Sequence, residues 1–152
     1  MRDGVRLALD VGTVRIGVAR SDRHAMLASP LETIRRGDGD AARVLELVAE
    51  HDAIELYVGL PRALSGRTTA STQDAIGFAR GLVAALGDDR VRFVDERLTT
   101  VSAAGQLHAV GKNAKRQRQV IDQVAATIIL EAALDSERRT GIQPGIPVSA
   151  IG

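Results

Sequence analysis

Strand-like and helix-like patterns of apolar residues follow one another along the chain. Three short apolar runs come first, at residues 5–12, 15–22 and 31–36. Only the turn GTVR links the first two runs, and strands this close must pair antiparallel, because a parallel crossover needs at least about a dozen residues. Gly12 is expected to give this turn a positive φ angle. The pattern therefore predicts an antiparallel group of three strands.

Helical periods begin after the third run. Residues 37–52 repeat apolar positions every three to four residues, and Asp40 is the expected N-cap of this helix. A second helix ends at Gly87, a residue type that is common after the last helical turn. Two more helices are predicted, over residues 99–110 and over residues 117–139. A basic loop is expected before the last of them.

Continuous apolar runs at residues 54–61 and 91–96 are typical of strands that are buried on both faces. The order β-β-β-α-β-α-β-α-α predicts an α/β fold with a five-stranded mixed sheet flanked by helices and right-handed later crossovers. We expect a single domain over residues 1–136 and a mobile, Gly/Pro-rich tail over residues 137–152. No stretch resembles a signal peptide or a membrane span, so we expect a soluble, cytoplasmic protein without a membrane partner.

Composition narrows the chemistry that this fold can carry. The 152 residues include no Cys, three widely separated His and only three aromatic residues. Disulfides, cysteine zinc sites, thiol nucleophiles and local His-pair metal motifs are therefore excluded. The scarcity of aromatic residues argues against binding of single strands by base stacking. Carboxylates and hard metal ions remain as the expected tools of any catalysis.

Positive charge is concentrated in one segment although the whole chain is nearly neutral. The chain has 20 basic and 19 acidic residues, and the segment KNAKRQR holds four basic residues without an acidic one. These candidate nucleic-acid-binding residues are Lys112, Lys115, Arg116 and Arg118. Arg62 and Arg67, in the loop after the run at 54–61, are further candidates. Such residues either contact phosphates, which would make affinity fall with salt, or are simply solvated.

Three acidic positions differ from the others because they end strands or interrupt an apolar helix. Asp10 ends the first strand, Asp95 and Glu96 follow the run VRFV, and Asp122 lies in the last helix. Ligands bind at strand ends in open α/β sheets, so carboxylates from these three positions are expected to converge. Neighbouring strand residues point to opposite faces, so only one of Asp95 and Glu96 can take part, and spacing does not choose between them.

Convergent carboxylates need a cation, and oxygen ligands of this kind suit Mg²⁺ or Mn²⁺. One or two such ions would activate water and stabilise the leaving oxygen in phosphodiester hydrolysis. The structural alternative is an Asp that caps a turn, a Glu paired with Arg97 and a helical Asp that faces water. Thr99 and Thr100 are caps of the third helix in this alternative. In the functional interpretation a Thr hydroxyl orients Glu96 or contacts a phosphate.

The motif DVGT, at residues 10–13, also has a second interpretation. A D-x-G-T hairpin can present backbone N–H groups to a phosphate, as in the actin and sugar-kinase ATPase fold. That fold uses two such lobes around the nucleotide, and 152 residues provide room for one. The structural interpretation is a tight hairpin that needs Gly12.

Four stretches in this order resemble the YqgF/RuvX family, a branch of the RNase H-like nucleases. They are LALDVGTVRIGVA (Leu7 to Ala19), VGLP (Val58 to Pro61), DERLTT (Asp95 to Thr100) and IDQVAATIILE (Ile121 to Glu131). The resemblance covers about the first 136 residues of the chain. It implies an RNase H-like, five-stranded sheet that begins with three antiparallel strands. It also implies that Asp10, Glu96 and Asp122 are the catalytic, metal-binding residues, which leaves Asp95 outside the triad.

The activity implied by the resemblance is metal-dependent cleavage of structured nucleic acid. Two substrates are expected of this family, the 5′ end of precursor 16S ribosomal RNA and the Holliday junction, and the residues do not separate RNA from DNA. Junction resolution needs two coordinated cuts and favours a homodimer, whereas end maturation needs one cut. The alternatives are a non-catalytic nucleic-acid or ribosome-assembly binding protein and, supported only by DVGT, an actin-like ATP binder.

Overall fold

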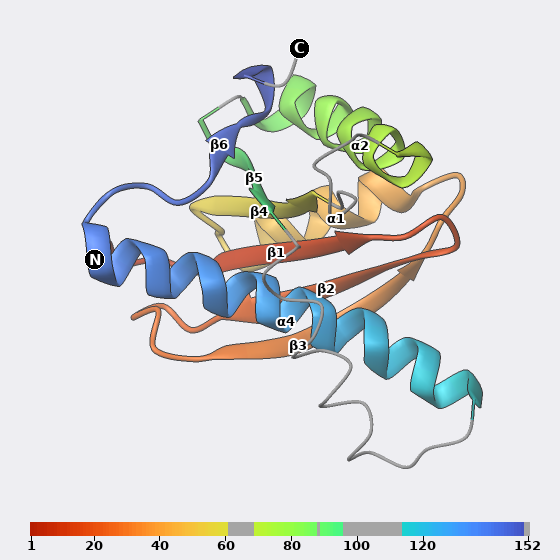
Figure 1. Cartoon of the computed structure of the whole chain (residues 1–152), viewed down its shortest axis with the longest axis horizontal. Helices are drawn as coiled ribbons and strands as arrows, with labels where there is room; N and C mark the ends of the chain where they lie inside the picture. The colour runs from red at the N-terminus through yellow and green to blue at the C-terminus, as the bar shows by residue number, and fades with distance from the viewer. Residues whose placement is uncertain (61–68, 88, 96–113, 151–152) are drawn as a thin grey trace.

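The structure is a computed structural model, which describes residues 1–60, 69–87, 89–95 and 114–150, with side chains in the last range from residue 121 onward. Figure 1 shows a twisted sheet with helices on both faces. Helices α1 (Asp40–Glu50) and α2 (Ala70–Leu86) cover one face, and the long helix α4 (Ala114–Thr140) crosses the other. The α/β prediction is confirmed.

The sheet has six strands in the order β3-β2-β1-β4-β5-β6. Their bounds are β1 Arg6–Val11, β2 Arg15–Ser21, β3 Ala28–Arg35, β4 Glu55–Leu60, β5 Val91–Asp95 and β6 Ile146–Pro147. The first three strands pair antiparallel, as predicted, and β4 and β5 continue the sheet parallel to β1. The register between β2 and β3 shifts at Val18 and Ala19, which leaves Leu31 of β3 without a partner beside Pro30. Pro30 is tolerated because β3 is an edge strand.

Successive side chains of each strand point to opposite faces of the sheet, and each face carries its own apolar core. Leu7 and Leu9 of β1 belong to the larger core, which lies under α1 and α2. Ala8, between them, belongs to the smaller core under α4, together with Tyr57 of β4. Small residues on this second face let α4 pack close to the sheet, where Ile129 and Leu130 are fully buried. The position of α4 determines which polar groups meet on that face.

The end of the chain differs from the prediction of a mobile tail and a five-stranded sheet. Helix α4 continues to Thr140, and the residues after it form β6, which pairs antiparallel with β5, and a short 3-10 helix, η2 (Val148–Ala150). The segment after α4 is held by apolar packing, because Val148 is buried in the larger core. Residues 137–150 are thus part of the packed structure. In the described part of the chain, no helix is both long and apolar enough to span a bilayer.

Two local predictions also differ from the structure, namely the N-cap of α1 and the φ angle of Gly12. The N-cap of α1 is Gly39, in a left-handed conformation, and Asp40 is the first helical residue, with its carboxylate accepting a hydrogen bond from the backbone of Gly37 at 3.2 Å. Gly12 is absent from the described glycines with positive φ. It is needed for space instead, because a Cβ there would lie 2.8 Å from the carbonyl oxygen of Arg15, across the turn.

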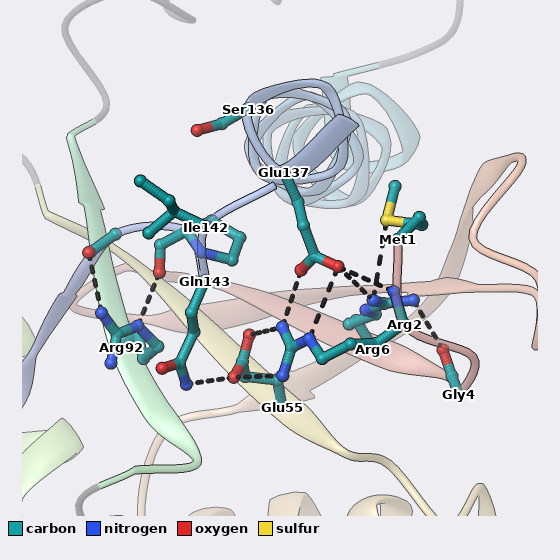
Figure 2. A network of polar contacts seen from close by, with 12 residues as sticks. Met1, Arg2, Gly4, Arg6, Glu55, Arg92, Ser136, Glu137, Ile142 and Gln143 are labelled. Atoms are coloured by element: carbon teal, nitrogen blue, oxygen red, sulfur yellow. Dashed lines mark hydrogen bonds and ion pairs between the residues drawn. The ribbon is translucent and has the colours of Figure 1, made fainter. Parts of the chain in front are cut away.

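A buried ionic network fixes the far end of α4 on the sheet (Figure 2). Glu137 accepts hydrogen bonds from Arg6 of β1 at 2.9 Å and from Arg2 at 2.6 Å. Arg2 also donates to Glu55 of β4 at 2.8 Å, and Gln143 donates to the same carboxylate. Arg6 is fully buried and Glu137 nearly so. The network therefore joins the start of the chain, two strands, α4 and the segment after it.

Candidate active site at the Gly17 crossing

Asp10 lies near the carboxyl end of β1, on the face that α4 covers. It is two residues after Ala8, which packs under α4, so strand alternation places both on the same side. The strand register sets Asp10 directly opposite Gly17 of β2. Opposed residues of an antiparallel pair project to the same face, with Cα atoms about 4.5–5.5 Å apart. Asp10, half-buried, thus projects beside Gly17.

Helix α4 packs directly against the backbone of β2 at Gly17. A Cβ atom at this position would overlap the backbone carbonyl group of Asp122 and would lie 2.9 Å from the Cβ of Asp122. The backbone of α4 therefore rests directly on β2 at Asp122. Because Gly17 is opposite Asp10, the structure brings Asp10 and Asp122 to neighbouring places on one sheet face. We call this place the Gly17 crossing, defined by Asp10, Gly17 and Asp122.

The side chain of Arg15 joins β2 to α4 at the same place. Its Nε donates a hydrogen bond of 2.7 Å to Oδ2 of Asp122. The side chain of Arg15 is 28% exposed and that of Asp122 is 16% exposed, so this ion pair is open to solvent on one side. A second contact of α4 is made by Gln123, whose amide donates to the hydroxyl of Thr33 on β3 at 2.9 Å. Both contacts hold the first half of α4 over the antiparallel strands.

Arg36 clamps the hairpin that carries Asp10. Its Nη1 donates to the carbonyl oxygen of Gly12 at 2.7 Å and to Asp74 of α2 at 2.7 Å, and its Nε donates to Asp40 of α1 at 3.0 Å. Its guanidinium also lies over the ring of Phe78, 5.2 Å from the centroid. The hydrogen bond from Arg36 lowers the pKa of the Asp74 carboxyl below its ordinary value. The turn beside Asp10 is thus tied to both helices of the opposite face.

The remaining predicted site residues fall into three groups. Asp95, the last residue of β5, shares its strand parity with Phe93, which packs in the core under α1 and α2, so it alternates away from the face of Asp10. Glu96, Thr99, Arg62, Arg67 and Lys112 lie outside the described residues. The backbone of Lys115, Arg116 and Arg118 lies in the first turns of α4.

The prediction that α4 begins at residue 117 after a basic loop is therefore corrected, since the helix begins at Ala114. Ala, Lys, Arg and Gln are all strong helix formers, which explains the earlier start.

The sequence analysis assigns no role to Gly17 of the crossing or to Arg15 beside it. Both residues stand in the stretch that carries the family resemblance. A signal for them was present, because a tight hairpin after Asp10 sets residues 15 and 17 on the face of Asp10. The contact of this face with Asp122, more than a hundred residues later in the chain, required the structure.

Comparison with known proteins identifies the family. Residues 4–136 match the family model for RuvX, described as Holliday junction resolvase. The chain belongs to the RuvX family. Relatives in this family include proteins named "Putative pre-16S rRNA nuclease" in Clavibacter sepedonicus and in Leifsonia xyli. The first is 59% identical over 95% of this chain and 91% of its own length, and the second is 58% identical over 97% and 96%.

The fold of this RuvX family member is that of RuvC from Thermus thermophilus. A RuvC structure in complex with a Holliday junction substrate aligns with a TM-score of 0.55 over 95% of this chain and 99% of the RuvC chain, at 17% sequence identity. A second RuvC structure from the same organism aligns with a TM-score of 0.56. The predicted RNase H-like architecture is confirmed, and the family and its named relatives identify the chain as a nuclease, a hydrolase of phosphodiester bonds.

Nucleases of this fold and family generally use divalent metal ions, and the crossing offers suitable donors. The chemistry fits, because Asp10 and Asp122 supply hard carboxylate oxygens from two facing elements, and Mg²⁺ is usually held by one or two carboxylates with water and substrate phosphates. Within the described ranges, no three acidic or His side chains gather closely enough to form a metal site. A third ligand would therefore come from outside those ranges, which is where Glu96 lies.

Proposed function

We propose that the Gly17 crossing is the catalytic site of an endonuclease, with Asp10, Glu96 and Asp122 as the catalytic and metal-binding residues. The observation that carries the proposal is the contact of Gly17 with the backbone of Asp122, opposite Asp10. Two carboxylates at neighbouring positions on one partly exposed face favour the binding of a cation. The family resemblance supplies Glu96, which follows β5 in the sequence.

Mg²⁺ or Mn²⁺ is the proposed cofactor. When bound, the ion supplies positive charge for the scissile phosphate and activates water for attack. Asp10 contributes its carboxylate from a strand end that Arg36 immobilises through the Gly12 carbonyl. Asp122 contributes its carboxylate from a helix that rests on the sheet without an intervening side chain. Such fixed placement is what positions reactants for phosphodiester hydrolysis.

Residues outside the crossing are proposed to hold the nucleic acid. We assign phosphate contacts to six basic residues that flank the site in sequence, namely Arg62, Arg67, Lys112, Lys115, Arg116 and Arg118. In the proposed site Gly12 supports the hairpin of Asp10, and Thr99 supports Glu96. A protein that reads backbone shape needs no stacking platform, which agrees with the three aromatic residues of the chain.

The proposed substrate is structured nucleic acid in the cytoplasm. Relatives with 58–59% identity are named as nucleases for pre-16S rRNA, which supports maturation of the 5′ end of that RNA. The family description and the fold of RuvC support cleavage of the Holliday junction. Resolution of a four-way junction requires paired cuts and hence a homodimer, whereas maturation of an RNA end requires one active site.

A parallel cleavage assay tests this proposal. A precursor-rRNA fragment and a four-way DNA junction are each incubated with the wild type and with Asp10→Asn, in Mg²⁺ and in Mn²⁺. We expect the wild type to cut at least one of them and Asp10→Asn to bind both while cutting neither. Binding without cleavage by the wild type in either metal would instead indicate a non-catalytic nucleic-acid binder.

A further inference from the structure

Arg15 uses only one of its N–H donors to bind Asp122. A guanidinium carries five N–H donors, and a single one, on Nε, bonds Oδ2 of Asp122. Among the described residues, Nη1 and Nη2 of Arg15 have no acceptor. Oδ1 of Asp122 likewise accepts no hydrogen bond from the described part of the chain. The pair therefore keeps donors and an acceptor available beside Asp10.

The ion pairs of α4 differ in burial in a way that separates a structural role from a binding role. Glu137 and Arg6, at the far end of the helix, are 4% and 0% exposed, and both oxygens of Glu137 are occupied by arginines. Arg15 and Asp122 are 28% and 16% exposed and share one hydrogen bond. A pair that served only to fix the helix would be expected to resemble the first. The second remains accessible to a ligand.

We infer that Arg15 is a substrate-binding residue, which holds Asp122 through Nε and binds a phosphate of the nucleic-acid backbone through its Nη groups. The inference rests on the proposed function, because that function brings a phosphodiester to the Gly17 crossing. A guanidinium fork suits the non-bridging oxygens of a phosphate, and its charge is permanent. Strand alternation points Arg15, Gly17 and Asp10 to one face, so the bound phosphate would lie next to both carboxylates.

The inference predicts effects of opposite sign on two ligands. Arg15 and a divalent cation both compete for the charge of Asp122, so removal of the positive charge should strengthen the binding of the metal alone. The same removal should weaken the binding of nucleic acid, because one phosphate contact is lost. An arginine that only orients Asp122 would give a different result, since its loss would weaken metal binding and leave the number of phosphate contacts unchanged.

The test compares Arg15→Gln with the wild type in two binding experiments that need no cleavage. Affinity for a structured RNA hairpin and for a four-way DNA junction is measured by fluorescence anisotropy in EDTA over a range of salt concentrations. Affinity for Mn²⁺ is measured by calorimetry on the protein alone. Arg43→Gln is the matched control, because Arg43 on α1 also pairs with carboxylates but lies on the opposite side of the sheet.

For Arg15→Gln we expect the slope of log affinity against log salt to become shallower by about one unit on at least one probe. We also expect Mn²⁺ affinity to rise about three- to tenfold, with both quantities unchanged in Arg43→Gln. An unchanged salt slope on both probes, or a fall in Mn²⁺ affinity, overturns the inference and leaves Arg15 as a residue that positions Asp122.

Thermal unfolding of each variant shows whether the fold is kept. If Arg15→Gln is unfolded, Arg15→Lys replaces it in both binding experiments, because Lys keeps the positive charge but lacks the forked guanidinium. Arg15→Lys should keep the salt slope and the Mn²⁺ affinity while weakening nucleic-acid binding. A loss of slope with Lys would contradict the inference. Failure of the proposed function is recognised separately, because Asp10→Asn would then leave cleavage unchanged whatever the result at Arg15.

Discussion

Gly17 shows how the absence of a side chain can determine a site. Any Cβ at this position would overlap the backbone of Asp122, so the short distance between helix and sheet depends on one residue type. The glycines of α2 differ, since Gly77 and Gly81 have no neighbouring atom within 4 Å of a built Cβ. A glycine pattern alone does not distinguish these cases. The sequence contained Gly17 in a strand-like run, and only the packing of α4 reveals its purpose.

Substitution of Gly17 by Ala should displace α4 at Asp122. We expect a loss of about 1–3 kcal/mol in the free energy of unfolding, because overpacking forces the backbone to shift. Cleavage should fall by about tenfold or more, since small displacements of reacting groups are costly. Urea unfolding and initial cleavage rates measure the two effects.

The matched control is Gly77→Ala on the exposed side of α2, which should gain about 0.5–1 kcal/mol through better helix propensity and should cleave like the wild type. If Gly17→Ala retained both wild-type stability and wild-type cleavage, the close packing at the Gly17 crossing would have no part in the activity.

At the scale of elements, strands β1 to β5 and the described α-helices could be predicted from the apolar patterns. The helix predicted over residues 99–110 lies outside the described residues. The run at 54–61 is β4, because it is continuous and too short for a buried helix, and the helix ending at Gly87 is α2, because its apolar residues recur at a helical period. The start of α4 and the strand β6 could not be predicted. A basic segment looks like a loop, and a two-residue strand has no pattern of its own. The pairing of β6 with β5 is a long-range contact, whereas the start of α4 follows from the helix propensity of the basic segment.

The ionic network at the far end of α4 leads to a prediction about stability. Substitution of Glu137 by Gln leaves Arg6 fully buried without its carboxylate partner. We expect a loss of about 3 kcal/mol in the free energy of unfolding, as for other broken buried pairs. Asp135→Asn, at an exposed ion pair with Arg139 on the same helix, should change stability by less than about 1 kcal/mol. Urea unfolding at neutral pH measures both variants.

The same network should respond to acid. Burial raises the pKa of the Glu137 carboxyl, but the hydrogen bonds from Arg2 and the charges of Arg6 and Arg2 outweigh it, so the pKa lies below its ordinary value. A lowered folded-state pKa means that the stabilisation is complete above the unfolded value of about 4.3 and is lost as pH falls through the folded value. The stability gap between wild type and Glu137→Gln should therefore narrow below about pH 4.3. A gap that widened in acid would contradict this assignment.

At the scale of the whole molecule, the face under α4 has two ends with different roles. One end is held by the network of Arg2, Arg6, Glu55 and Glu137 (Figure 2), and the other is the partly exposed Gly17 crossing. Asp122 and Glu137 stand on one helix, so the network holds the element that carries a proposed catalytic carboxylate. The chain is nearly neutral, with 20 basic and 19 acidic residues. Its ion pairs include the network around Glu137 and the partly exposed pair of Arg15 and Asp122.

The candidate site could be predicted from sequence only in outline. Asp10 and Asp122 are candidates because they interrupt apolar patterns, and the family resemblance favours Glu96 over Asp95. The parity of Asp95 with Phe93 gives a physical reason to favour that choice. The contact of Arg15 with Asp122 depends on a register between elements distant in the chain, which no local pattern contains.

The most direct test of the central claim is the cleavage rate of Asp10→Asn. The matched control is Asp95→Asn, because Asp95 also ends a strand but alternates to the opposite face of the sheet. Both proteins are assayed on the substrate that the wild type cuts, in Mg²⁺, with binding measured in EDTA. We predict that Asp10→Asn loses about a hundredfold or more in rate while it keeps its fold and its nucleic-acid affinity, and that Asp95→Asn cleaves close to the wild-type rate. Wild-type cleavage by a correctly folded Asp10→Asn would contradict the assignment of the Gly17 crossing as the catalytic site.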